Sequence, residues 1–120
     1  MNMVGVEIDK ITVPLLKDYL RIQNDKEDDF LAILLVSAQD YIEDFLGQPF
    51  DNYRQSYVRQ FDGTYILQEV QLPKAFTMAC LALCAYWYGN RTLITARYEN
   101  GNEVPYMFTN LLLPYRVRME

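Results

Sequence analysis

The clearest hydrophobic pattern in the chain lies between residues 26 and 46. Its apolar residues recur every three or four positions, the spacing of one face of an α-helix. These residues are Phe30, Leu31, Leu34, Leu35, Ala38, Tyr41, Ile42, Phe45 and Leu46. Gly47 is a typical C-terminal cap residue, and Pro49 prevents the helix from continuing. At the other end, Asn24 or Asp25 can cap the first turn, so the pattern predicts a helix over residues 26–46.

Two further segments carry helical signals. Thr12 is a candidate N-cap and Pro14 falls in the first turn, so the short amphipathic run that follows predicts a helix over residues 12–22. Pro73 starts the second segment, in which nearly every position is apolar or small. This segment predicts a helix over residues 73–88 that is hydrophobic on all sides.

Polar and aromatic residues mix in the stretch between these two long helices. Asp62 and Gly63 lie between two such runs and are a typical hairpin turn, which predicts a small β-hairpin over about residues 53–67. A chain of 120 residues can scarcely cover the helix at 73–88 on every side. We therefore expect part of that helix to meet another subunit, or the hairpin to fold over it.

The C-terminal part begins with a polar stretch. Residues 89–104 predict a long loop, and loops of this length are usually functional or disordered. Pro105 then opens a short apolar segment that predicts a helix over residues 106–113. The predicted fold is therefore mainly α: a single domain over residues 1–120, with a small bundle of three to four helices, a hairpin and a long loop.

Composition and charge favour a component of an assembly. The chain is 51% hydrophobic and contains ten tyrosines, a residue enriched at protein–protein interfaces. Its net charge of −5 argues against a protein that binds phosphate backbones over its whole surface. Residues 1–72 carry 6 Lys or Arg and 13 Asp or Glu, whereas residues 73–120 carry 5 and 3. The two parts can therefore present different faces to different neighbours.

The cysteines indicate a reduced interior. Cys80 and Cys84 lie one helical turn apart within the apolar run, and the chain has no histidine. This arrangement argues against a zinc site and against a disulfide framework, so we predict two core cysteines and synthesis in a reducing cytoplasm. The N-terminus has acids where a signal peptide would be apolar, and residues 75–88 are shorter than the ~20 needed to cross a bilayer. We therefore expect no signal peptide and no membrane partner.

Few residues suggest catalysis. There is no histidine to serve as a base for a serine or cysteine nucleophile, and the five glycines form no phosphate-binding loop. An acidic cluster lacks the alternating spacing and central glycine of a calcium loop, and indicates a solvated helix N-terminus. It consists of Asp25, Glu27, Asp28 and Asp29. We predict no enzymatic activity, no cofactor and no metal, with metal-assisted catalysis at this cluster as the weakest alternative.

The stretch at residues 84–92 can be interpreted in two ways. In the first, Trp87 and Tyr88 belong to the core helix and Gly89 marks its end, while Asn90 and Arg91 satisfy the last carbonyls. In the second, arginines and tyrosines form an aromatic and basic surface that stacks on single strands. The residues of that surface are Arg91, Arg97, Tyr98, Tyr106, Tyr115, Arg116 and Arg118. Four arginines in an acidic protein support it weakly, so we favour the structural interpretation.

Three stretches, in this order, resemble the head–tail connector proteins of tailed bacteriophages and prophages, also called head-completion or adaptor proteins. The first is ITVPLLKDYLRIQNDKEDDFLAILLVSAQDYIEDFLGQPF, with a short helix, an acidic turn and a long helix that ends at a glycine. The second is LPKAFTMACLALCAYWYGNR, and the third is VPYMFTNLLLPYRV. Together they cover nearly the whole chain, and their order and spacing are more specific than any one alone.

The resemblance implies a structural virion protein at the head–tail interface. Family members assemble into a ring beneath the portal after DNA packaging, so the implied partners are further copies in twelve-fold symmetry, the portal protein, and a tail-side stopper or tail-completion protein. DNA would pass through the lumen without being read, repelled by an acidic wall. The hairpin is the part that matches least well.

The family pattern also implies where contacts with the portal or a neighbour lie. They fall after the core helix and in the C-terminal segment, roughly residues 89–103 and 113–120. The candidate contact residues are Arg97, Tyr98, Glu99, Glu103, Pro114, Tyr115, Arg116 and Arg118. The main alternative function is a small helical nucleic-acid-binding regulator of a phage or mobile element, which would need a basic recognition helix. Neither predicted long helix has one.

Overall fold

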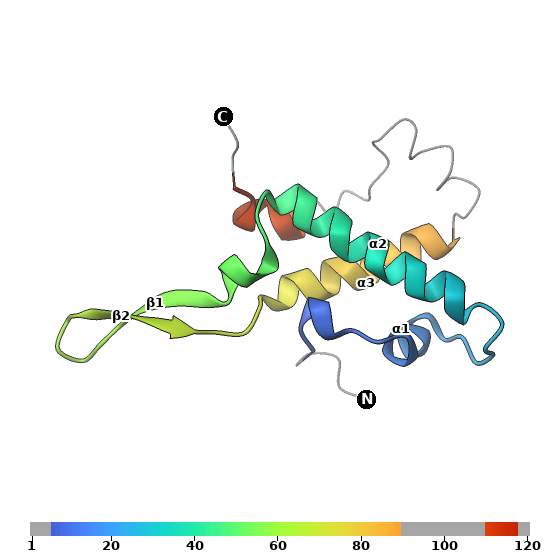
Figure 1. Ribbon diagram of the computed structural model, residues 1–120, viewed down its shortest axis with the longest axis horizontal. Helices are drawn as coiled ribbons and strands as arrows, with labels where there is room; N and C mark the ends of the chain where they lie inside the picture. The colour runs from blue at the N-terminus through green and yellow to red at the C-terminus, as the bar shows by residue number, and fades with distance from the viewer. Residues whose placement is uncertain (1–5, 90–109, 118–120) are drawn as a thin grey trace.

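Two long antiparallel helices, α2 and α3, form the centre of the molecule, and a hairpin leads away from one end of them (Figure 1). The computed structural model describes residues 6–89 and 110–117. In chain order, the elements are η1 (Ile8–Lys10), α1 (Val13–Leu20), α2 (Asp28–Leu46), η2 (Phe50–Tyr53), β1 (Gln55–Arg59), β2 (Tyr65–Glu69), α3 (Lys74–Gly89) and η3 (Leu113–Tyr115). The predicted class, a small helical bundle with a hairpin, is confirmed.

The predicted ends of two helices are confirmed by their backbone bonds. The side chain of Thr12 accepts a hydrogen bond from the backbone N–H of Leu15 at 3.3 Å, and Pro14 lies in the first turn of α1. Gly47 ends α2 with a φ of 83°, and its N–H donates to the last carbonyls of the helix. A left-handed φ of this kind is what glycine adopts without strain.

The predicted N-cap of α2 is wrong. The cap residue is Glu27, whose side chain makes no cap hydrogen bond. Asn24 instead accepts the backbone N–H of Lys26 at 3.0 Å and closes the turn before the helix. Asp25 pairs with the ammonium group of Lys17 at 2.6 Å. Both side chains are therefore used by the connection between α1 and α2, and α2 begins three residues after Asp25.

The C-terminal end of α1 carries a left-handed residue that is not glycine. Arg21 has a φ of 61°, and its side chain is exposed. Because a Cβ in this region costs about 1 kcal/mol, we expect Arg21→Gly to raise the free energy of unfolding by about 0.5–1 kcal/mol. Chemical denaturation would measure the gain. Arg21→Ala is the matched control, since it removes the same side chain but keeps the Cβ, and it should show no comparable gain.

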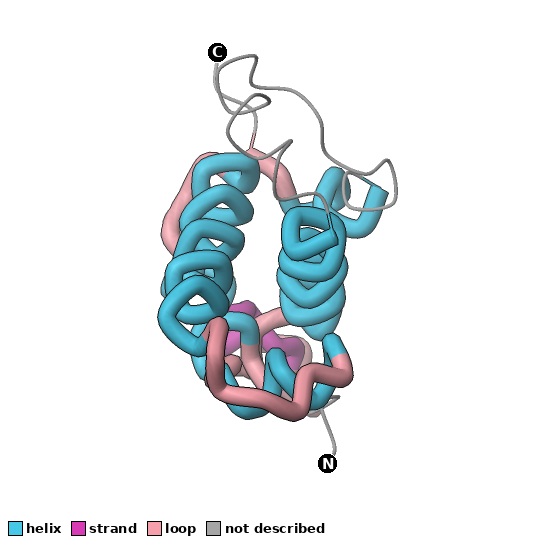
Figure 2. Tube along the Cα trace, turned by 90° about the vertical axis from the view of Figure 1, so that its right-hand side faces the viewer, coloured by secondary structure: helices cyan, strands magenta, loops and turns pink. Residues whose placement is uncertain are grey.

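The core is one hydrophobic cluster between α2, α3, α1 and η1, and Figure 2 shows α2 and α3 side by side. The predicted apolar face of α2 is confirmed: Leu31, Leu34, Leu35, Ala38, Ile42 and Leu46 are buried. Cys80 and Cys84 are free and fully buried, as predicted for core cysteines. The hydrogen bond with Cys84, and then burial, raise the pKa of the Cys80 thiol well above its ordinary range, so it stays protonated.

The expectation that the hairpin covers α3 is wrong. The hairpin points away from the helical body (Figure 1), and α3 instead contacts α2, α1 and η1. These elements bury residues on several sides of α3: Phe76, Thr77, Ala79, Cys80, Leu81, Leu83 and Cys84. The chain therefore covers most of its own apolar helix, and Met78, 55% exposed, marks the side left open.

The hairpin lies two residues later than predicted. β1 and β2 pair antiparallel from Gln55↔Glu69 to Arg59↔Tyr65. The predicted turn is confirmed: Gly63 has a φ of 90°, and the carboxylate of Asp62 accepts hydrogen bonds from the N–H and the hydroxyl of Thr64. These hydrogen bonds lower the pKa of Asp62.

The C-terminal segment is described in part. Residues 110–112 are helical and η3 follows, which agrees with the end of the predicted helix at 106–113. The start of that helix and residues 90–104 of the predicted loop lie outside the described residues.

Candidate functional site

Trp87 and Tyr88 fasten the C-terminal end of α3 to α2. The ring of Trp87 meets Tyr41 edge to face, with centroids 5.9 Å apart. Tyr88 lies 6.4 Å from the ring of Phe30, and its hydroxyl donates to the carboxylate of Glu27 at 2.9 Å. Burial beside α3 raises the pKa of the Tyr41 hydroxyl. These contacts support the structural interpretation of this stretch, and Gly89 is the last residue of α3, as predicted.

The acidic turn forms an ion-pair cluster around one lysine. The ammonium group of Lys17 lies 2.6 Å from Asp25 and 3.0 Å from Asp28. Hydrogen bonds to these carboxylates raise the pKa of Lys17, and the lysine lowers the pKa of Asp25. Within residues 6–89 and 110–117, no group of three acidic or thiol side chains could hold a metal ion. Lys17 was missed in the sequence because its partners lie on the far side of a turn.

The C-terminal segment is held against the ends of α2 and α3. The ring of Tyr115 packs edge to face on Phe76 at 5.1 Å and on Tyr53 at 6.4 Å. The hydroxyl of Tyr53 donates to the carbonyl of Tyr115 at 2.5 Å. The guanidinium of Arg116 lies 4.7 Å from the centre of the Phe45 ring, a cation–π contact. Pro114 lies in η3 and is exposed.

Most of the remaining predicted site residues belong to the segments after α3 and after Val117. Asn90, Arg91, Arg97, Tyr98, Glu99, Glu103 and Arg118 lie outside the described residues, as does most of the alternative aromatic and basic surface. Only Tyr115 and Arg116 of that surface are described. The ring of Tyr115 packs on Phe76, and the charge of Arg116 lies over the ring of Phe45. A role for either residue in binding a neighbour stays a prediction.

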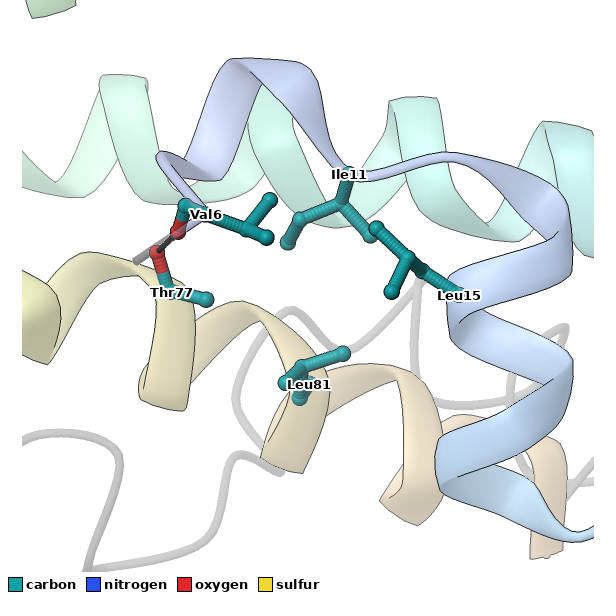
Figure 3. A pocket seen from close by; sticks show the side chains of 5 residues that line it. All are labelled: Val6, Ile11, Leu15, Thr77 and Leu81. Carbon is teal, nitrogen blue, oxygen red and sulfur yellow. Dashed lines mark hydrogen bonds between the residues drawn. The ribbon is translucent and has the colours of Figure 1, made fainter. Parts of the chain in front are cut away.

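One small apolar depression lies between η1, α1 and α3 (Figure 3). Its lining residues are Val6, Ile11, Leu15, Thr77 and Leu81. The only polar side chain among them is Thr77, whose hydroxyl donates to the carbonyl of Val6 at 2.6 Å. With that hydroxyl satisfied and no room for a ligand, the depression is a packing seam that ties the N-terminal segment to α3.

Two exposed apolar surfaces were missed in the sequence. The first is the hairpin, where the exposed residues are Tyr57, Phe61, Tyr65, Ile66 and Leu67. The second is the outer side of α2, where Ile33 is 66% and Val36 54% exposed. The sequence does indicate the second surface, because Ile33 and Val36 are apolar but lie outside the apolar face that the helical repeat predicts. Surface patches of this kind often mark protein–protein contacts.

These surfaces, the helical bundle and the lack of a built catalytic group in the described part all fit a structural protein. A family model described as phage gp6-like head-tail connector protein matches residues 10–116. The chain belongs to this connector family. No curated protein matches the connector, and no solved structure matches it. The resemblance seen in its sequence is therefore confirmed.

Membership gives this connector a general role. It is a phage structural protein of the head–tail interface, and the family implies interaction with portal and tail proteins in the virion. In the described residues, no helix is both long enough and apolar enough to cross a membrane. The regulator alternative finds no support in α2, which carries five acidic residues and no basic one. A recognition helix for nucleic acid needs the opposite charge.

Proposed function

We propose that this connector assembles into a homo-oligomeric ring below the portal, extends the DNA channel after packaging, and presents a platform for the tail-side stopper or tail-completion protein. Twelve copies would match the symmetry expected of the portal. The observation that carries the proposal is the projecting hairpin, whose large apolar side chains are exposed in the single chain. A two-stranded hairpin is marginally stable alone, so it gains from cover by a neighbour.

The charge of the connector suits a channel. DNA has to slide through the lumen without being held, and a wall with excess carboxylates repels its phosphates. The net charge is −5, and α2 alone carries five acidic residues. We place α2 between neighbouring copies at the edge of the lumen, and the C-terminal segment toward another ring.

Contacts with the portal or a neighbouring ring are assigned to the segment after α3 and to the C-terminal segment. The proposed contact residues are Arg97, Tyr98, Glu99, Glu103, Pro114, Tyr115, Arg116 and Arg118. Among these, Pro114, Tyr115 and Arg116 have described positions, and each keeps exposed surface beside the helical body. That placement supports their assignment because an exposed segment anchored at several points can dock with little loss of conformational entropy.

Ring assembly can be tested with the purified connector, alone and mixed with portal particles. We expect closed rings on the portal in negative-stain images, and a stoichiometry of twelve connectors per portal by mass measurement. Binding should lose little affinity when Asp18, an exposed acid on α1, is changed to Asn. A connector that stays monomeric at every concentration and never joins portal particles would overturn the proposal.

A further inference from the structure

The hairpin presents two different faces. Because strand neighbours alternate, the pairs Gln55↔Glu69, Tyr57↔Leu67 and Arg59↔Tyr65 lie on one face, and Ser56↔Gln68 and Val58↔Ile66 lie on the other. On the first face, Tyr57 is 72%, Tyr65 63% and Leu67 53% exposed, and Arg59 is also exposed. We call these four residues the tyrosine face. It combines a broad apolar centre with one cation toward the tip of the hairpin, and the carboxylate of Glu69 lies on the same face at the base.

The outer side of α2 presents the matching pattern. Ile33 and Val36 are exposed and lie between acidic residues, with Asp29 one turn before them and Asp40 and Asp44 one and two turns after. Steps of three and four residues place all five on one side of the helix. We call them the outer stripe. It has an apolar centre flanked by carboxylates, whereas the tyrosine face has an apolar centre flanked by an arginine.

The charges at the C-terminal half of the outer stripe are unbalanced. Asp40 and Asp44 lie near the negative end of the α2 dipole, and no basic residue occupies its last turn. Within the described residues, no ion pair joins either carboxylate to a cation, and none joins Arg59 to an acid. Asp29, in contrast, lies in the first turn, where the dipole favours its charge. Arg59 therefore gains more by facing Asp40 or Asp44 than by facing Asp29, and Asp40 is the one that lies beside the apolar pair Ile33 and Val36, as Arg59 lies beside Tyr57.

Within one chain the two surfaces cannot meet. The hairpin starts after η2 at the C-terminal end of α2 and leads away from the helical body (Figure 1). Its strands contact each other and η2. Its base is also fixed, because Arg54 binds both Asp9 and Asp51, and its carbonyl accepts the N–H of Val70. The direction of the hairpin is therefore set by the body, and its tyrosine face points at something outside the chain.

We infer that the tyrosine face of one copy docks on the outer stripe of α2 in the next copy, with Arg59 paired to Asp40. The spacings agree: Arg59 lies two residues, about 7 Å, from Tyr57 along β1, and Asp40 lies four residues, about 6 Å, from Val36 along α2. Two different patches in contact make a head-to-tail interface, which closes into a ring when the rotation permits. The inference rests on the proposed ring and names the surface that builds it.

Charge reversal tests the pairing. Arg59→Glu and Asp40→Arg should each weaken self-association at least tenfold, measured by sedimentation velocity and by ring formation on portal particles. The double variant should recover most of the loss, because each copy then offers a glutamate to an arginine of the next. Asp18→Arg, on the exposed side of α1, makes the same charge change away from the stripe and should assemble normally.

The apolar centre has its own test. Val36→Ser removes contact area without a charge and should also weaken assembly, while the exposed position leaves the folded state intact, as circular dichroism would verify. If the native connector forms rings and the single reversals do so equally well, or if the double variant stays as weak as the singles, the inference fails and the ring stands. If the native connector forms no ring in solution or on the portal, the ring and the inference fail together.

Discussion

Replacing Phe76 by alanine is expected to lower the free energy of unfolding by about 3–5 kcal/mol. Phe76 is fully buried on α3, where the ring lies 5.0 Å from Tyr53, 5.1 Å from Tyr115 and 6.1 Å from Phe50. Truncation removes the centre of this aromatic cluster and leaves a cavity that its partners cannot close without moving. The lost free energy therefore includes two parts: the gain from burying the ring away from water, and the edge-to-face contacts with its neighbours.

Denaturation followed by circular dichroism would measure this loss. Phe76→Leu is the control, because it keeps most of the volume and should cost less than half as much. In Phe76→Ala the near-ultraviolet circular dichroism signal should also decrease, since Tyr53 and Tyr115 lose the ring that fixes their own rings. A Phe76→Ala variant within 1 kcal/mol of the native protein would contradict the prediction and would show that the cluster rearranges freely.

The aromatic cluster matters for assembly because it joins two of the proposed contact regions. Tyr53 lies in η2, directly before the hairpin, and Tyr115 lies in the C-terminal segment. The hydroxyl of Tyr53 donates to the carbonyl of Tyr115, so one contact fixes both. Substitution of Phe76 therefore disturbs the base of the hairpin and the C-terminal segment, although Phe76 itself is buried.

Local signals explain which parts of the fold could be predicted. The helix expected at 26–46 is observed as Asp28–Leu46, because Gly47 supplies a left-handed cap and Pro49 blocks further turns. The hairpin turn could likewise be predicted from local sequence, because it needs a positive φ at Gly63, which glycine adopts without strain. The N-cap of α2 failed because Asp25 has a distant partner, Lys17, that no local pattern contains.

Placement of elements could not be predicted, because it depends on contacts between distant segments. The hydrophobic sequence of α3 predicts that the helix is covered, but it does not say by what. The structure shows that α1, α2 and η1 cover it, and the sequence alone could not distinguish these elements from a neighbouring subunit. The same limit applies to the hairpin, whose existence followed from its turn but whose direction depends on the Arg54–Asp9 pair at its base. The candidate site is divided in the same way: Trp87 and Tyr88 lie on α3, the helix that the sequence predicted, while the outer stripe of α2 was missed.

The second large effect is expected at Trp87. Trp87→Ala should lower the free energy of unfolding by about 2 kcal/mol, less than a fully buried aromatic because the side chain is half-buried. The loss comes from the edge-to-face contact with Tyr41 and from the cover that Trp87 gives the core at the end of α3. Trp87→Phe keeps an aromatic ring at the contact and is the matched control, with a smaller loss.

Two measurements separate this core role from an assembly role for Trp87. Thermal denaturation reports the stability of the single chain, and binding to portal particles reports assembly. With Trp87 removed, Tyr41 becomes more accessible, so its raised pKa should fall toward the ordinary tyrosine value, which carbon NMR of the labelled ring can follow. A variant with native stability and an unchanged Tyr41 pKa that no longer joins the portal would instead place Trp87 in an interface. The contact at 5.9 Å predicts the opposite result, because the ring that Trp87 meets belongs to its own chain.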